Sequence, residues 1–235
     1  MNFFQRFFGV FFNSNETFKN LSEKPVWVDA LIVLLVFLIL ISYLTFPFQS
    51  KDSAELMKSN VKLKERLGEE RFNQMIENLE NPSPTRRIFT AFIFAPIGGI
   101  IGFFLSAGII FGISRIFSSY GKFKALLAVF LHANFIDKVF GNLVRYLLIL
   151  SKKSVFQVST GLPILFPRLE VTSTSYVILS QFDFFQIWMF GILAFGISHI
   201  FKISLKKSLF ISYGFWVLKS LVSILFGLIS LRAYG

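Results

Sequence analysis

Residues 125–150 read ALLAVFLHANFIDKVFGNLVRYLLIL, a stretch that is long and apolar enough to cross a bilayer as one helix. At about 100° per residue, its polar side chains fall within a sector of roughly 140°, with His132 on the far side. The sector contains Asn134, Asp137, Lys138, Asn142 and Arg145. A charge at the centre of a membrane costs about 3 kcal/mol. We therefore expect this stripe to face the protein interior or a wet cavity, not lipid.

The composition around this stretch is that of a membrane protein. Of 235 residues, 54% are hydrophobic and 33 are Phe, and the mean hydropathy is +0.65. These values lie outside the range of ordinary soluble domains. The sequence predicts an all-α membrane protein, formed as a single domain over residues 1–235.

Apolar runs of membrane-spanning length predict a bundle of five transmembrane helices. The predicted spans are residues 28–48, 88–117, 125–150, 182–201 and 209–229. Pro47 is expected to end the first span, and Pro96 to bend the second. The second span also carries small residues at small-xxx-small spacing, which allow another helix to approach closely. The predicted packing residues are Ala95, Gly98, Gly99, Gly102 and Ser106.

The two segments that flank the first span have different characters. Residues 1–24 carry Phe at i, i+3 and i+4 spacing, which predicts an amphipathic helix in the membrane interface. The alternative is a helix packed beneath the bundle. Residues 49–87 are predicted to be a polar helical loop, broken at Asn81-Pro82-Ser83-Pro84. We favour a solvated helix or helical hairpin that caps the bundle over a segment that binds a partner.

The positions of Lys and Arg predict the orientation. The short basic turns at 115–124 and 202–207 lie on the cytoplasmic side if the N-terminus does. Arg86 and Arg87 of the long loop argue for the opposite orientation. We expect a cytoplasmic N-terminus because short loops follow the positive-inside rule more strictly.

Motifs for common enzyme chemistry are absent from the sequence. There is no HExxH or GxSxG motif, the chain has no Cys, and His132 and His199 lie on different predicted spans. We therefore expect no enzyme activity, metal or cofactor. The net charge of +11 is spread over the connecting segments and does not indicate nucleic acid. The expected partners are membrane lipid with anionic headgroups, and a protein partner or a second copy.

Residues 176–218, YVILSQFDFFQIWMFGILAFGISHIFKISLKKSLFISYGFWVL, resemble the closing two spans of the Yip-one domain family. An aspartate, a Phe, an Ile-Trp pair, Gly residues and a short basic turn carry the resemblance. These are Asp183, Phe184, Ile187, Trp188, Gly191, Gly196, Lys202, Lys206, Lys207 and Trp216. The third span departs from the prokaryotic pattern, which has a Tyr and a Pro near its start.

The resemblance implies a five-span integral membrane protein with a cytoplasmic N-terminus. It further implies a protein of the prokaryotic type, located in the cytoplasmic membrane. Eukaryotic members of the family are linked to early secretory membranes and small GTPase binding. The resemblance does not extend these two properties to the present chain.

Two functions are consistent with the stripe of the third span. In the first, the protein is a non-enzymatic scaffold or adaptor, and the stripe is a buried structural network. Asp137 then pairs with Lys138, Arg145 or Lys219, and Asp183 or the asparagines complete the network. In the second, the stripe lines a pathway for lipid, an ion or a small solute, and its basic groups meet an anion. We favour the first, although the surplus of positive charge keeps transport open.

Overall fold

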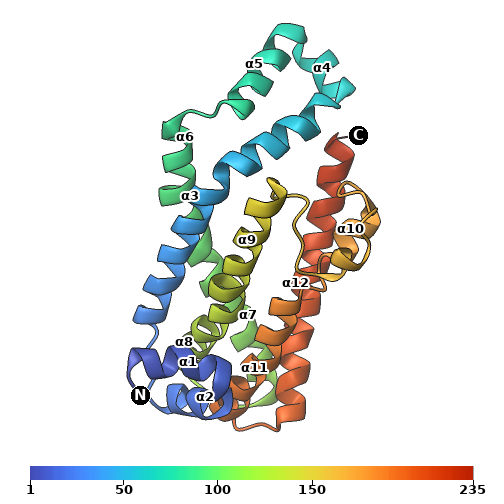
Figure 1. Ribbon diagram of the computed structural model, residues 1–235. Helices are drawn as coiled ribbons and strands as arrows, with labels where there is room; N and C mark the ends of the chain where they lie inside the picture. The colour runs from blue at the N-terminus through green and yellow to red at the C-terminus, as the bar shows by residue number, and fades with distance from the viewer. Residues whose placement is uncertain (235) are drawn as a thin grey trace. The chain divides into compact units, whose positions relative to one another are not determined.

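The computed structural model describes residues 1–234, and most of these residues are helical (Figure 1). The helices are α1 (Phe3–Phe12), α2 (Ser14–Glu23), α3 (Val28–Lys58), α4 (Val61–Leu67), α5 (Glu69–Glu80), α6 (Pro84–Phe89), η1 (Thr90–Phe94), α7 (Ala95–Phe117), α8 (Phe123–Asn134), η2 (Phe135–Gly141), α9 (Asn142–Lys152), η3 (Leu162–Leu165), α10 (Thr174–Leu179), α11 (Phe184–Phe201) and α12 (Leu205–Tyr234). Gly235, the last residue of the predicted single domain, lies outside the described residues.

The helices form two compact units, which we describe separately. Unit 1 contains Met1–Leu38, Pro96–Asn142 and Phe184–Leu221. Unit 2 contains Ile39–Ala95, Leu143–Asp183 and Val222–Gly235.

Unit 1 has its core around α8, whose residues from Ala125 to Asn134 are all buried. Helix α11 packs against both α8 and α2. This packing is close because α11 has a glycine, Gly196, where the side chain of Val129 lies against its backbone. In Figure 1, α1 and α2 lie crosswise to α8 and α11 at one end of this unit.

The N-terminal segment forms two short helices, where the sequence predicted one over residues 1–24. Asn13 separates α1 from α2. One side of α1 exposes Phe4, Phe8 and Phe12. On its other side, the guanidinium of Arg6 is buried and forms an ion pair with Asp29 of α3. Helix α1 therefore exposes aromatic side chains on one side, and its buried charge is neutralised within unit 1.

Unit 2 contains the predicted polar loop, folded as a helical hairpin. The hydroxyl of Ser50 donates to the Leu79 carbonyl over 2.6 Å, which joins the end of α3 to the end of α5. Phe72, Ile76 and Leu79 are the buried residues of α5. Their spacing places them on one face of the helix, so apolar burial holds the hairpin closed. The break at residues 81–84 is confirmed, since α5 ends at Glu80 and α6 begins at Pro84.

The prediction that Pro47 ends the first helix is wrong. Helix α3 continues through Pro47 to Lys58. Proline cannot donate the usual hydrogen bond to the carbonyl four residues earlier, which belongs to Tyr43. Arg87 supplies this bond instead, from Nε to the Tyr43 carbonyl over 3.0 Å. The helix can therefore continue because a residue of α6 satisfies the acceptor that Pro47 leaves unpaired.

Four helices of the described residues are long and apolar enough to span a membrane. They are Val28–Lys58, Pro84–Phe117, Phe184–Phe201 and Leu205–Leu231. The remaining predicted span, residues 125–150, forms the helical run α8–η2–α9 and is not among these four. Thr90–Phe94 is π-helical and ends two residues before Pro96, where the sequence predicted a bend.

Candidate functional site

The charged middle of the predicted third span lies in a π-helical segment. Asp137 and Lys138 both belong to η2, and their carboxylate oxygen and amino nitrogen are 2.9 Å apart. The side chain of Asp137 is 2% exposed and that of Lys138 is 33% exposed. Single π-helical turns inside α-helices are frequent at functional sites. In this segment, the buried carboxylate of Asp137 is paired with the ammonium group of the next residue, Lys138.

The other predicted site residues of unit 1 have polar contacts of their own. Asn134 is buried and donates from Nδ2 to the Phe130 carbonyl over 2.8 Å. Lys219 is exposed on α12 and donates to Oε1 of Gln186 on α11 over 2.8 Å. Asn142 is half-buried at the start of α9.

Arg145 and Asp183 form the main polar cluster of unit 2. Arg145 Nη2 and Asp183 Oδ1 are 2.9 Å apart, and Arg145 Nε donates to Thr160 Oγ1 over 2.9 Å. The Thr160 hydroxyl donates to the second oxygen of Asp183 over 2.5 Å. The acid is 6% exposed and therefore well screened from solvent. These three residues, the Arg145–Thr160–Asp183 cluster, join α9 to the following loop and to the residue that precedes α11.

The backbone near this cluster is tightly packed. Gly161 forms an antiparallel bridge with Asp183, and Leu162 N donates to the Phe182 carbonyl over 3.2 Å. A Cβ atom on Gly161 would lie 3.0 Å from the same carbonyl oxygen. A Cβ there would be in tighter contact than usual, so glycine favours the close approach of the loop to residues 182–183 that brings Thr160 to Asp183.

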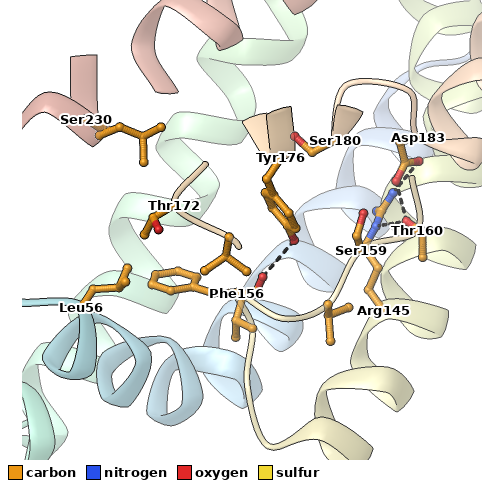
Figure 2. A pocket seen from close by; sticks show the side chains of 14 residues that line it. Leu56, Arg145, Phe156, Ser159, Thr160, Thr172, Tyr176, Ser180, Asp183 and Ser230 are labelled. Atoms are coloured by element: carbon orange, nitrogen blue, oxygen red, sulfur yellow. Dashed lines mark hydrogen bonds and ion pairs between the residues drawn. The ribbon is translucent and has the colours of Figure 1, made fainter. Parts of the chain in front are cut away.

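A cavity of about 400 Å³ borders the cluster (Figure 2). Figure 2 shows Arg145, Thr160 and Asp183 on one side of it, and Leu56 on the other. Apolar side chains form most of the remaining lining, among them Val155, Phe156, Val158, Val171 and Leu231. A mostly apolar cavity with a few convergent polar groups suits an amphipathic ligand.

Tyr176 gives this cavity a further polar group. Its hydroxyl donates to the Phe156 carbonyl over 2.9 Å, as Figure 2 shows. Burial raises the pKa of the Tyr176 phenol. The group therefore stays protonated and acts as a donor at neutral pH.

Sequence reasoning missed Asp52, which organises the turn after α9. Its Oδ2 atom accepts hydrogen bonds from Ser154 Oγ at 3.0 Å, from Val155 N at 2.6 Å and from Phe156 N at 3.0 Å. Asp52 is 7% exposed. Its position in a polar segment gave no signal, because a solvated helix carries many such acids. Thr160 was missed for a similar reason, since its partners are 15 and 23 residues away.

Among residues 1–234, no group of three or more His, Cys, Asp or Glu side chains could hold a metal ion. His132 is fully buried and its Nδ1 atom contacts the Ala128 carbonyl at 2.8 Å. His199 Nε2 lies 2.8 Å from Asn15 Oδ1 of α2. Both histidines thus contact neutral groups of unit 1.

Comparison with known proteins identifies the family. The sequence model of the Yip1 domain matches residues 8–227, which includes every predicted site residue. No curated protein and no solved structure matches the chain. The matched range contains the four apolar helices almost completely, in agreement with a multi-pass protein of the membrane. The chain belongs to the Yip1 domain family of integral membrane proteins.

Proposed function

We propose that this Yip1-family protein is a non-enzymatic membrane scaffold or adaptor, and that the charges of residues 125–150 are structural. The pairing of these charges carries the proposal. Asp137 pairs with Lys138 and Asp183 pairs with Arg145, each within its own unit. Two acids and two bases sum to zero, so no exogenous anion is needed to neutralise these four groups.

Lys219 is the third basic group that the sequence predicted for the network, and it lies on α12. It is exposed, and its amino group contacts the neutral side chain of Gln186. Lys219 lies near the middle of the apolar segment Leu205–Leu231, where an ammonium group is costly to expose to lipid. Its contact with Gln186 joins α12 to α11 through a polar pair, which supports a structural role for Lys219.

The proposal includes a five-span bundle with a cytoplasmic N-terminus, in which residues 125–150 cross the bilayer. Because the chain has no Cys, single cysteines can be placed at two exposed positions, Ser119 before α8 and Ser151 in the last turn of α9. A membrane-impermeant maleimide is expected to label the two positions from opposite sides. Labelling of both from the same side would replace five spans by four.

The proposal also places α1 in the membrane interface. Its exposed Phe4, Phe8 and Phe12 would enter the acyl boundary, while Arg6 faces Asp29. In liposomes, brominated lipids are expected to quench a Trp introduced at Phe8, which is exposed, more than one introduced at Phe18, which is buried. Equal quenching at the two positions would place α1 beneath the bundle instead.

A second candidate function is the movement or binding of an amphipathic lipid or solute. The cavity beside the Arg145–Thr160–Asp183 cluster favours it, since the cavity is mostly apolar and has a charged pair in its wall. In this alternative, a ligand anion would replace the Asp183 carboxylate as the partner of Arg145.

Liposomes containing the purified protein distinguish the two candidates. Under the scaffold proposal, scrambling of fluorescent phosphatidylcholine and leakage of a small dye stay at the level of empty liposomes. A transporter would replace the scaffold if the wild type shows flux above that level and Arg145→Met abolishes this flux. The exposed control variant Arg168→Met should then retain the flux.

The adaptor role needs its own test, because absence of flux does not show a partner. A photo-crosslinking residue placed at Val61 of the hairpin, or at Phe12 of α1, is expected to capture a discrete partner in native membranes. Both positions are exposed apolar residues. Absence of a discrete product at both would count against the adaptor proposal.

A further inference from the structure

A second cavity, of about 610 Å³, lies within unit 1 and has a strongly basic wall. It forms where α2, the turn before α8 and the end of α11 meet. Its charged lining residues are Lys19, Glu23, Lys122, Lys124 and Lys202, with His199 beside them. Four lysines against one glutamate give a formal charge of +3 without the histidine.

The four lysines of this basic cavity have no carboxylate partner among the described residues. This distinguishes the basic cavity from the Arg145–Thr160–Asp183 cluster, where the acid and the base are joined. Like charges gathered around one cavity repel each other, and a bound anion would remove that repulsion.

The walls of the basic cavity are held in place by contacts among its elements. Ser118 Oγ donates to the Phe201 carbonyl over 2.6 Å, which ties the turn to the end of α11. Gly121 has a φ of +97°, and a Cβ atom there would lie 2.7 Å from the Phe201 ring. Lys202 places its ammonium 4.6 Å from the centre of the Tyr120 ring. The site is thus largely formed before a ligand arrives, which favours binding.

Two of the lysines lie where their own helix disfavours them. Lys122 is the N-cap of α8 and makes no capping hydrogen bond with its side chain, and Lys124 lies in the first turn. Positive charge at a helix N-terminus opposes the helix dipole. An anion in the basic cavity would offset this unfavourable interaction, because it would be attracted both by the N-terminus of α8 and by the lysines.

We propose that the basic cavity binds a phosphate group, and that an anionic phospholipid headgroup is its source. The cavity is formed at the end of α11, an apolar helix of membrane-spanning length, where headgroups are expected. Free phosphate has the same chemistry and is the other source. This site is independent of the scaffold proposal, because it uses none of the paired charges of residues 125–150.

The test compares two pairs of lysines. Lys122→Gln/Lys124→Gln removes two charges from the basic cavity. Lys206→Gln/Lys207→Gln removes two from the first turn of α12, where both lysines are exposed and outside the cavity lining. Both pairs relieve an unfavourable helix-dipole interaction, so neither is expected to unfold the protein. Native mass spectrometry of full-length protein from mixed phosphatidylglycerol and phosphatidylcholine nanodiscs measures which lipid is retained.

The wild type is expected to retain phosphatidylglycerol preferentially, and the cavity pair is expected to lower this preference by roughly 25-fold, since each Lys near an anionic surface contributes roughly fivefold. The control pair lies outside the cavity lining and should change the preference much less. A second arm measures inorganic phosphate binding in nanodiscs of phosphatidylcholine alone. Lysine-dependent binding there, without phosphatidylglycerol preference, would make free phosphate the source. An equal loss of phosphatidylglycerol preference in the two double variants would contradict the proposed site. Absence of binding in both arms would also contradict it.

Discussion

Arg87 Nε donates a hydrogen bond to the Tyr43 carbonyl over 3.0 Å, and its guanidinium carbon lies 3.7 Å from the centre of the Tyr43 ring. The carbonyl is the acceptor that Pro47 leaves without its helical donor. The Arg87 side chain therefore satisfies the open acceptor of α3 and also packs on the Tyr43 ring. This relationship allows a proline in the middle of a 31-residue helix.

Arg87→Met is expected to destabilise unit 2 by about 1–3 kcal/mol, because the Tyr43 carbonyl would lose its donor. The measurement is thermal unfolding in detergent, with exposed Arg86→Met as the matched control. In a Pro47→Ala background the alanine N–H supplies the donor, so Arg87→Met should cost less there. An equal cost in both backgrounds would show that the bond to the carbonyl does not matter.

Breaking the Arg145–Asp183 pair is expected to destabilise unit 2 by about 3 kcal/mol, since one charge would remain without its partner in a poorly solvated site. Arg145→Met and Asp183→Leu are the single variants, and unfolding in detergent is the measurement. The double variant should lose less than the sum of the two. Additive losses would mean that the two side chains act independently.

Asp52→Asn is expected to loosen the turn after α9, because a neutral amide oxygen accepts the three hydrogen bonds of Asp52 Oδ2 more weakly than a charged carboxylate does. Amide hydrogen exchange at Val155 and Phe156 should become faster, in line with a loss of about 1–3 kcal/mol locally. Glu55→Gln, an exposed change on the same helix, is the control. Unchanged exchange at both amides would show that the Asp52 carboxylate does not hold this turn.

Gly141→Ala is expected to destabilise unit 1 by about 1–3 kcal/mol, because the new Cβ would lie 2.9 Å from the Phe185 ring. Gly98→Ala is the matched control, since a Cβ there meets nothing within 4 Å. It should leave monomer stability unchanged or raise it by about 1 kcal/mol. Similar effects at both positions would contradict close packing at Gly141.

Some predicted packing residues of the second span are in close contact with another helix, and others have open space beside them. Gly99 faces Leu38, where a Cβ would lie 2.6 Å from its Cδ1 atom. Gly98 and Gly102 have open space, Ser106 is half-buried, and Ala95 is half-buried in unit 2. If the small-residue spacing serves contact between copies, Gly98→Ala should lower the dimer fraction measured by crosslinking in membranes, without affecting monomer unfolding.

The sequence determined the helices and the membrane character of this protein, because both depend on local composition. Apolar runs, the Pro-rich break at residues 81–84 and the 3.6-residue spacing of Phe72, Ile76 and Leu79 are all local patterns. The sequence also placed the charged stripe in residues 125–150, since a polar residue in an apolar run is visible without a structure.

Only the tertiary structure decided which groups the charges meet. Arg87 donates to a carbonyl 44 residues earlier, and Asp52 accepts bonds from a turn about 100 residues later. Asp183 is 38 residues from Arg145 and meets it through a loop that Gly161 allows to close. The four lysines of the basic cavity come from three separate segments. Hydrogen bonds and ion pairs act over about 3 Å in space, and sequence spacing does not determine distances between residues so far apart along the chain.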